Sequence, residues 1–298
     1  MTLVADTPLT PEPEAVGPSP PTGRLLRSAL GLWRTRIGLV LAGAMIAVAL
    51  FGPYVAPHGA SDFVGAPNSS SVGTFGTDHL GQDVLSRFLS GGRSILAISA
   101  AATLMGLLLG LTVGLVSAYA RNLLDDGLMR LMDVILAFPQ IMLALVALVT
   151  LGPKTWLIIV AVGGTTMPRV ARVIRGAAQP IIERDFVAAA DALGVPRWRI
   201  LVREVLPNVL SPLMVEASLR LTYSIGLVAT LGFFGFTPNP GGADWGLMIF
   251  ENRLALVVQP WGVLLPVIAI ALITLGTGLI GDGVARAAAG IDRGRAAE

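Results

Sequence analysis

Six stretches of this chain carry no charged side chain and approach or exceed the length needed to cross a lipid bilayer. They cover residues 37–57, 94–120, 134–153, 155–168, 221–243 and 254–281. About 20 apolar residues, each rising ~1.5 Å along an α-helix, are needed to cross a hydrocarbon core of ~30 Å. Only 13% of the residues are charged, against roughly 25% in soluble domains. We therefore predict an all-α integral membrane protein.

The charge-free stretches predict six transmembrane helices, near 37–56, 94–119, 134–152, 155–175, 209–235 and 261–281. The fourth must include Arg169 and Arg172 near one end. In the second, Gly106, Gly110 and Gly114 recur every four residues, a spacing that lets two helix backbones approach closely in lipid. We favour a close contact within this chain over one between subunits.

The positions of Lys and Arg predict the orientation, because positively charged loops stay in the cytoplasm. With the N-terminus inside, the outside segments hold only Arg87, Arg93, Lys154 and Arg253, and Arg220 lies within the fifth span. Both termini are therefore expected to be cytoplasmic. The formal net charge of +2 follows from this asymmetry and gives no reason to expect nucleic acid as a partner.

The chain divides into four parts. A Pro-rich tail at 1–22 cannot bury enough surface to fold, and we expect it to be disordered, cytoplasmic and not a signal peptide. Residues 23–93 hold the first span and an extracytoplasmic segment. Residues 94–284 form the core of the membrane domain, and 285–298 form a second cytoplasmic tail.

Polar segments at the membrane surface give weaker signals. Outside, Asp78 or Thr77 is predicted to cap a short helix with an apolar face of Leu80, Val84, Leu85 and Phe88. Inside, 121–133 is predicted to be a helix that runs into the third span, with Asp125, Asp126 and Asp133 at the interface. There is no cysteine, and we interpret His58 and His79 as solvated or hydrogen-bonded rather than metal-binding. We expect no cofactor.

A charged, amphipathic segment at 181–207 stands between the fourth and fifth spans. Gly194 and Pro196 predict two short helices joined by an elbow, since Gly favours a helix end and Pro a helix start. The first helix, at 181–193, is expected to present one small apolar face formed by Phe186, Ala189, Ala190 and Leu193. The second contains Arg197, Arg199, Arg203 and Glu204, and Leu206-Pro207 ends it and begins the fifth span.

This segment resembles the EAA loop of bacterial ABC-importer permeases. Ala189-Ala190, Gly194 and Leu206-Pro207 match that pattern, whereas Ala188 stands where it has Glu and Glu204 where it has Ile. The peptide-type variant of the loop is similar to DFVAAADALG at 185–194. Other stretches also resemble the C-type permease subunit of dipeptide and oligopeptide importers, in the peptide/nickel transporter family: FGTDHLGQDVLSR at 75–87, LMDVILAFP at 131–139, LGFFG at 231–235, DWGLM at 244–248 and GDG at 281–283.

The resemblance implies a type I importer permease in the bacterial cell membrane. Such a chain forms the pathway with a second homologous permease, and it works with one or two cytoplasmic ATPase subunits and an extracytoplasmic substrate-binding protein. Those ATPase subunits would bind ATP and Mg²⁺, since this chain has no GxxxxGK[ST] phosphate loop. It is therefore expected not to be an enzyme. The cytoplasmic coupling helix would contact the ATPase through Asp185, Phe186, Ala189, Ala190, Leu193, Gly194, Leu206 and Pro207.

Two further groups of residues are candidates. The outside segment 236–259 contains Asp244, Trp245, Glu251 and Arg253, which we predict to form an outer gate or a contact for the binding protein. Glu216 and Arg220 are spaced to form an ion pair on one helix face. We favour a structural or interfacial role for this pair over contact with the substrate.

Three alternatives remain open. The same architecture could import nickel or another small solute, because cargo is chosen mainly by the external binding protein. A secondary transporter or channel working without ATP would need charged relays inside the membrane, and the first, second, third and sixth spans nearly lack them. A membrane-embedded enzyme is disfavoured, since the sequence offers no metal cluster and no Ser/His arrangement.

Overall fold

The computed structural model describes residues 22–120 and 123–289. The predicted tails at 1–22 and 285–298 therefore lie outside the described residues, except for Thr22 and 285–289, which are helical. Within these ranges the chain is helical apart from its loops and two isolated β-bridges. The helices are α1 (Thr22–Gly31), α2 (Trp33–Val55), α3 (Val84–Ser90), α4 (Gly92–Ala120), α5 (Leu123–Ala137), α6 (Gln140–Leu151), α7 (Thr155–Ile182), α8 (Asp185–Ala192), α9 (Arg197–Ile200), α10 (Leu206–Phe233), α11 (Trp245–Asn252) and α12 (Trp261–Ala289). A π turn, η1 (Leu201–Val205), precedes α10, and a 3-10 turn, η2 (Arg253–Ala255), follows α11.

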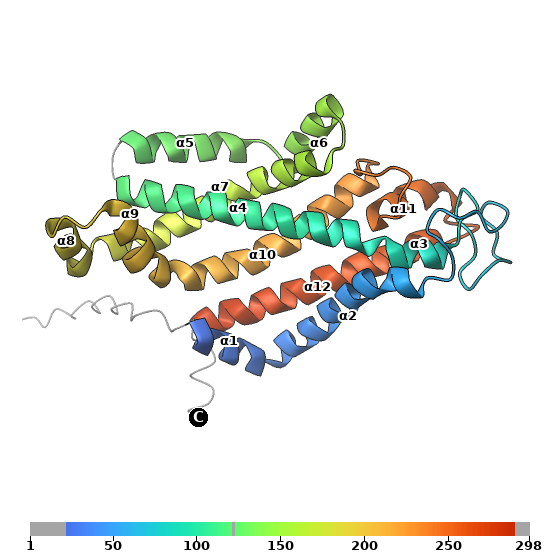
Figure 1. The fold of residues 1–298 in the computed structure, drawn as a ribbon, viewed down its shortest axis with the longest axis horizontal. Helices are drawn as coiled ribbons and strands as arrows, with labels where there is room; N and C mark the ends of the chain where they lie inside the picture. Colours follow the sequence, from blue (N-terminus) through green and yellow to red (C-terminus); the bar gives the residue numbers. More distant parts are fainter. Residues whose placement is uncertain (1–21, 121–122, 290–298) are drawn as a thin grey trace, which may run out of the picture.

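Four long helices are apolar enough to cross a membrane. They are α2, α4 together with α3, α7 and α12, and they confirm the first, second, fourth and sixth predicted spans as long apolar helices. Two of them run further than predicted, because α7 ends at Ile182 and α12 at Ala289. The long helices lie side by side along the longest axis of the molecule (Figure 1).

The third predicted span has a different shape. We expected one helix to run from the cytoplasmic segment into 134–152, but α5 and α6 meet at an angle of 82°. The break lies at Phe138-Pro139, and Pro139 is the N-cap of α6. Proline has no N–H to donate and restricts the residue before it to extended backbone, so the helix ends there. The expectation of one continuous helix was wrong.

The fifth predicted span forms a helix, α10, that is not among the four candidate spans. It contains Glu216 and Arg220 together with several hydroxyl side chains, and it falls short of the hydropathy of the four long helices. The described residues therefore hold four candidate spans, or five if the bent pair α5–α6 counts as one.

The glycines of α4 pack against α7, which runs beside it over most of its length. Gly106 faces Gly163 and Thr166, Gly110 faces Val170, and Gly114 faces Ala171 and Ile174. These neighbours all belong to α7, so the expected close contact lies within this chain. The two helices form a tightly packed pair because α4 has no side chain at these three positions.

Replacing Gly110 with alanine is expected to loosen this pair. A Cβ atom there would lie 2.6 Å from the Val170 Cβ and 2.8 Å from the Met167 carbonyl oxygen. Forcing extra volume into a packed contact costs about 1–3 kcal/mol. The Gly164→Ala variant is the matched control, since a Cβ at Gly164 meets nothing within 4 Å. Denaturant unfolding of the purified chain measures both, and equal midpoints would contradict the packing argument.

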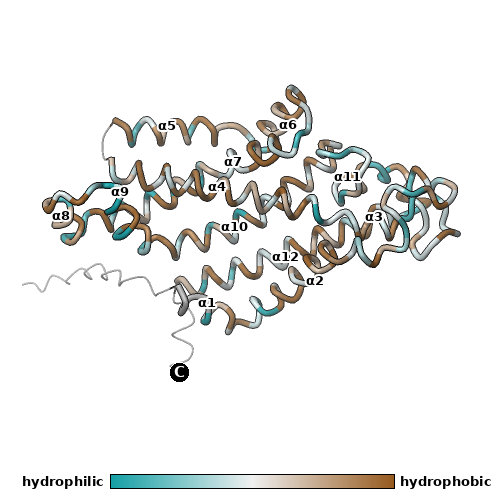
Figure 2. The backbone as a smooth tube through the Cα atoms, viewed as in Figure 1, coloured by the Kyte–Doolittle hydropathy of each residue, from teal (hydrophilic) through white to brown (hydrophobic). Residues whose placement is uncertain are grey.

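Polar residues gather at the two ends of the molecule, around α8 and α9 at one end and around α3 and α11 at the other (Figure 2). We call the second group the outer cap, defined as residues 56–83, α3 and 234–260. Between these ends the helix surfaces are mainly apolar. This distribution is typical of a protein whose middle faces lipid.

The short outer helix differs from the prediction in its cap. α3 begins at Val84, and its N-cap is Asp83, whose carboxylate accepts a hydrogen bond from the Ser86 amide at 3.0 Å. Asp78 instead closes a turn, accepting from the Leu80 and Gln82 amides at 2.9 and 2.8 Å. Gly81, with φ of +85°, makes that turn possible. The prediction of Asp78 or Thr77 as the cap was therefore wrong.

Candidate functional site: the α7–α10 loop and the outer cap

The segment between α7 and α10 folds as the predicted elbow, with shorter helices. Residues 181 and 182 belong to α7, so the first short helix is α8, from Asp185 to Ala192. At its end, Gly194 has φ of +75°. The Gly194 amide donates to the Asp191 carbonyl and the Val195 amide to the Ala190 carbonyl, at 3.0 and 3.1 Å. These two bonds form a Schellman motif, which needs a residue in the left-handed region at this position.

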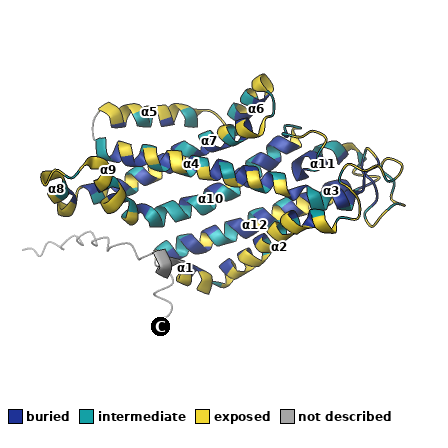
Figure 3. Cartoon of the chain, viewed as in Figure 1, coloured by how far each residue is buried: buried dark blue, intermediate teal, exposed yellow. Residues whose placement is uncertain are grey.

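One side of α8 packs on the membrane helices and the other faces solvent. Val187 is only 3% exposed and joins a core cluster with Ile182 and Ile200. Phe186 and Leu193 are 42% and 83% exposed, and Ala189 is exposed beside them. We call these three residues the α8 face. Of the predicted face, only Ala190 turns partly inward, where it packs against the same cluster. The exposed residues of α8 and α9 are visible at one end of the molecule (Figure 3).

The second short helix continues into α10 through a π turn. We expected Leu206-Pro207 to end it, but the chain stays helical from Arg197 to Phe233. Pro207 has no N–H, so the turn before it cannot be closed by an α-helical bond from that residue. The Leu206 amide donates to the Leu201 carbonyl, five residues back, and the Asn208 side chain donates to the Glu204 carbonyl at 2.7 Å. π turns of this kind occur frequently at functional sites.

Tyr119, at the end of α4, contacts both helices of the loop. Its hydroxyl is 3.1 Å from the Asp191 carboxylate on α8, and its ring lies 5.6 Å from the Arg197 guanidinium on α9. Tyr119 was not among the predicted site residues. In the sequence it is one tyrosine at the end of an apolar stretch. There it cannot be distinguished from an ordinary aromatic residue at the membrane interface.

Two of the three aspartates predicted at the inner interface, Asp125 and Asp133, form ion pairs with α7. Asp125 is buried, and its two carboxylate oxygens accept from Arg175 at 2.7 and 2.5 Å. Ser117 on α4 also bonds to Asp125. Asp133 pairs with Arg172 near the surface. Two ion pairs of different burial therefore attach α5 to α7.

The outer candidates are mostly interior. Asp244 is the N-cap of α11 and accepts from the Gly246 and Leu247 amides at 2.9 and 3.2 Å. Desolvation raises the pKa of its carboxyl group, although the two backbone hydrogen bonds act in the opposite direction. Trp245 is fully buried and stacks on Phe88, 5.8 Å between ring centroids, while its Nε1 donates to the Phe88 carbonyl at 2.9 Å.

Glu251 and Arg253 have different surroundings. Glu251 lies 2.9 Å from Arg87, a buried residue that also pairs with Asp78. Arg253 is exposed and stacks on the Phe250 ring at 4.0 Å. Three of the four candidates, Asp244, Trp245 and Glu251, therefore make contacts within the outer cap. Of the four, only Arg253 is exposed enough to contact another protein. Arg87, which was not predicted as a site residue, is the buried cation in this network.

The remaining polar candidates are engaged within the fold. Glu216 and Arg220 form the expected pair at 2.9 Å, and both are buried. The His58 imidazole lies 3.6 Å from Asp83, and that of His79 lies 4.0 Å from Asp78. In the described parts of the chain, no group of three or more His, Asp or Glu side chains is placed to hold a metal ion.

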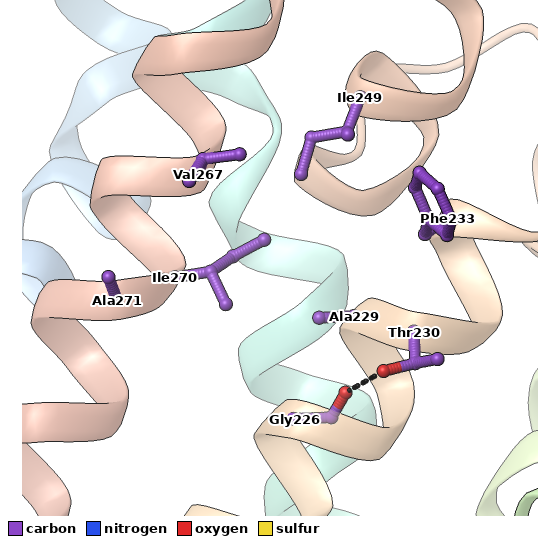
Figure 4. A pocket seen from close by; sticks show the side chains of 8 residues that line it. All are labelled: Gly226, Ala229, Thr230, Phe233, Ile249, Val267, Ile270 and Ala271. Carbon is purple, nitrogen blue, oxygen red and sulfur yellow. Dashed lines mark hydrogen bonds between the residues drawn. The ribbon is translucent and has the colours of Figure 1, made fainter. Parts of the chain in front are cut away.

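A cavity of about 350 Å³ lies between α10, α11 and α12 (Figure 4). Its only side-chain hydroxyl, on Thr230, donates to the Gly226 carbonyl at 2.7 Å. The cavity therefore offers a ligand apolar contact alone. It is lined by Gly226, Ala229, Thr230, Phe233, Ile249, Val267, Ile270 and Ala271.

Comparison with known proteins identifies the class. Residues 106–289 match the family described as "Binding-protein-dependent transport system inner membrane component". That range contains the α7–α10 loop and all four outer candidates. The chain belongs to this family, as the relatives below also show. It is a multi-pass membrane component of a bacterial transport system.

Curated relatives match most of the chain. The dipeptide transport system permease protein DppC of Alkalihalophilus pseudofirmus is 31% identical and covers 93% of this chain and 94% of its own. The di/tripeptide permease DppC of Pseudomonas aeruginosa is 34% identical, over 83% and 84%. The glutathione transport permease GsiD of Pectobacterium atrosepticum is also 34% identical, over 80% and 81%.

A solved structure has a similar fold. A chain of the inward-facing methionine ABC transporter MetNI aligns with a TM-score of 0.50 at 22% identity, over 67% of this chain and 96% of that one. The likeness supports a shared helical arrangement and carries no information about cargo.

Proposed function

We propose that this chain is one of two homologous permease subunits of an ATP-driven importer of di- or oligopeptides. The second permease completes the pathway, one or two ATPase subunits bind ATP and Mg²⁺ on the cytoplasmic side, and a binding protein delivers cargo outside. Relatives named for dipeptides, di/tripeptides and glutathione, itself a tripeptide, favour peptide cargo. The chain itself has no catalytic role.

We further propose six spans with both termini in the cytoplasm. They are α2, α4, the bent pair α5–α6, α7, α10 and α12. In α10 the Glu216–Arg220 pair reduces the penalty of burying either charge in lipid. This count places α8 and α9 inside and the outer cap outside, in agreement with the distribution of basic residues. Two parts of the chain then act as one permease. They are the first span with its outer segment, 23–93, and the core, 94–284, which includes the coupling loop at 181–207.

The observation that carries the proposal is the α8 face. A helix whose inner side is fixed by Val187 in the core presents Phe186, Ala189 and Leu193 to solvent. Exposed apolar side chains on a rigid base are typical of a docking surface. ATP-driven closure of the ATPase subunits would displace α8, and the packed loop would pass that displacement to α4, α7 and α10. The equilibrium between inward-open and outward-open states shifts accordingly.

On the outside, we propose that Arg253 contacts the binding protein. Leu254 in the same η2 turn and Val257, two residues after it, are also exposed. Asp244, Trp245 and Glu251 hold this turn in place from within the outer cap, and any gating by the segment would act through them.

A substitution series at Gly194 tests the coupling role. A Cβ at Gly194 would meet nothing within 4 Å, so backbone conformation alone decides the outcome. Asparagine tolerates φ of +75°, whereas valine does not and carries a strain of about 1–2 kcal/mol. We expect Gly194→Val to lower peptide uptake per ATP hydrolysed several-fold in reconstituted vesicles, with Gly194→Asn close to the parent. Equal uptake for Gly194→Val and the parent would refute the coupling role.

A further inference from the structure

A second cavity, of about 450 Å³, lies between α2, α4, α10 and α12. Its walls are apolar. The single hydroxyl, of Thr277, already donates to the Ile273 carbonyl at 2.8 Å and bonds to Thr222 at 2.9 Å. The one charged residue is Arg93, at the start of α4. The walls are formed by Ile46, Leu50, Leu96, Ala97, Ala100, Leu221, Ile225, Ile273 and Thr277.

The exposed face of α2 shows which solvent surrounds this cavity. Its large exposed side chains include Trp33 and Tyr54 at the two ends and Val40 and Phe51 between them. Trp33 and Tyr54 are 21 positions apart, about 31 Å of helix, which equals the ~30 Å thickness of a hydrocarbon core. Aromatic residues at this separation mark the two interfaces of a lipid-facing helix. Tyr54 therefore lies at the level of the outer headgroups.

Arg93 lies at the same level. Its guanidinium is 5.0 Å from the Tyr54 ring, and its Nε and Nη2 donate to the Ala49 and Leu50 carbonyls at 3.2 and 2.5 Å. Pro53 has no N–H to give the Ala49 carbonyl, so Arg93 supplies the missing donor. Its Nη1 has no hydrogen-bond partner within the described residues, and the side chain is exposed. A cation with free donors is thus held at headgroup depth.

The cavity descends from Arg93 to the depth of one leaflet. Arg93 and Ala100 are seven positions apart on α4, about 10 Å along the axis, within the ~15 Å that half of the hydrocarbon core spans. Ala97 and Ala100 are exposed at the opening, beside Ile46 and Leu50. The opening therefore faces the apolar layer directly below the headgroups.

We propose that this cavity binds a glycerophospholipid of the outer leaflet, with its phosphate on Arg93 and an acyl chain between the four helices. An anionic phosphate complements the guanidinium, which forms strong charge-assisted bonds to phosphate oxygens. A peptide does not suit this site, because its amide groups would find no partners on the apolar walls. The lipid would brace α2 against α4 and α10.

The test is native mass spectrometry of the assembled transporter purified from vesicles. The parent is expected to retain phosphatidylglycerol or phosphatidylethanolamine. It should retain much less diacylglycerol, which lacks the phosphate. Inorganic phosphate should not displace the lipid. Arg93→Gln should lower retention about tenfold or more, as expected for the loss of one hydrogen bond between charged groups. Ala97→Leu, which fills the opening and keeps the arginine, should lower it as well.

The matched control is Arg253→Gln, since Arg253 is also an exposed outer arginine stacked on an aromatic ring and bonded to a carbonyl. Its retention should equal the parent's. Arg93→Lys keeps the charge and should retain the lipid. It is the control for a loss of lipid that is caused only by weakened support of α2. If Arg93→Gln and Ala97→Leu retain as much phospholipid as the control, or if diacylglycerol is held equally well, the proposal is wrong.

Discussion

Replacing Leu193 with glutamine is expected to separate this chain from its ATPase subunits while leaving its own fold intact. Leu193 is 83% exposed, so its side chain contributes little to the folded state of the permease alone. If it is buried in a partner, it contributes about 1.5–3 kcal/mol to the complex, or roughly tenfold to a hundredfold in affinity. The Schellman motif that ends α8 uses backbone atoms only and should survive the change.

Two measurements decide this prediction. Co-purification with the ATPase subunits should fall tenfold or more, and ATP-driven peptide uptake should fall with it, whereas the unfolding midpoint of the isolated permease should not change. Leu123→Gln is the matched control, because Leu123 is 87% exposed at the same end of the molecule but lies on α5. A similar loss in both variants would assign the effect to general surface hydrophobicity and not to the α8 face.

Of the substitutions considered for this chain, replacing Arg175 with leucine should lower the free energy of unfolding the most. The change leaves the Asp125 carboxylate buried, with Ser117 as its remaining side-chain partner. Removing one member of a buried ion pair costs about 3–5 kcal/mol, since the other charge stays uncompensated. Because the Arg175 side chain is 29% exposed, we expect a value near the lower end, about 3 kcal/mol. The free energy of unfolding in denaturant measures it.

Arg172→Leu provides the control on the same helix. Its pair with Asp133 is exposed on both sides, at 48% and 60% of the side chains, and surface pairs contribute about 0–1 kcal/mol. The double variant Arg175→Leu with Asp125→Leu should recover much of the stability, because it removes the unpaired charge along with its partner. If Arg175→Leu and Arg172→Leu behave alike, the Asp125 pair is not buried as described.

Much of the helical framework follows from the sequence because membrane spans need long apolar runs. The absence of charge located α2, α4, α7 and α12 correctly. The same criterion missed the break at Pro139, since hydropathy averages side chains and takes no account of a missing backbone donor. The preceding Phe138 and the proline itself were the available signal. The charged pair Glu216 and Arg220, which sets α10 apart from the other long helices, could be read directly from the sequence.

The candidate site was predictable where its chemistry is local. Gly194 and Pro196 define the elbow through backbone preferences that act within a few residues. The outer candidates depend on distant contacts: Trp245 packs on Phe88, and Glu251 meets Arg87. Each pair is more than 150 positions apart in the chain, and a single sequence holds no signal for such pairing. Thus Asp244 and Trp245 looked like surface groups but form part of the interior.

The π turn before α10 changes how positions on that helix must be counted. It accommodates one residue more than an α turn would, and a residue corresponds to about 100° of rotation around the axis. A helical wheel drawn from Arg197 at a constant 3.6 residues per turn therefore assigns residues beyond Pro207 to the wrong azimuth. Cysteine pairs or spin labels intended to face a neighbouring helix should be placed by counting afresh from Leu206.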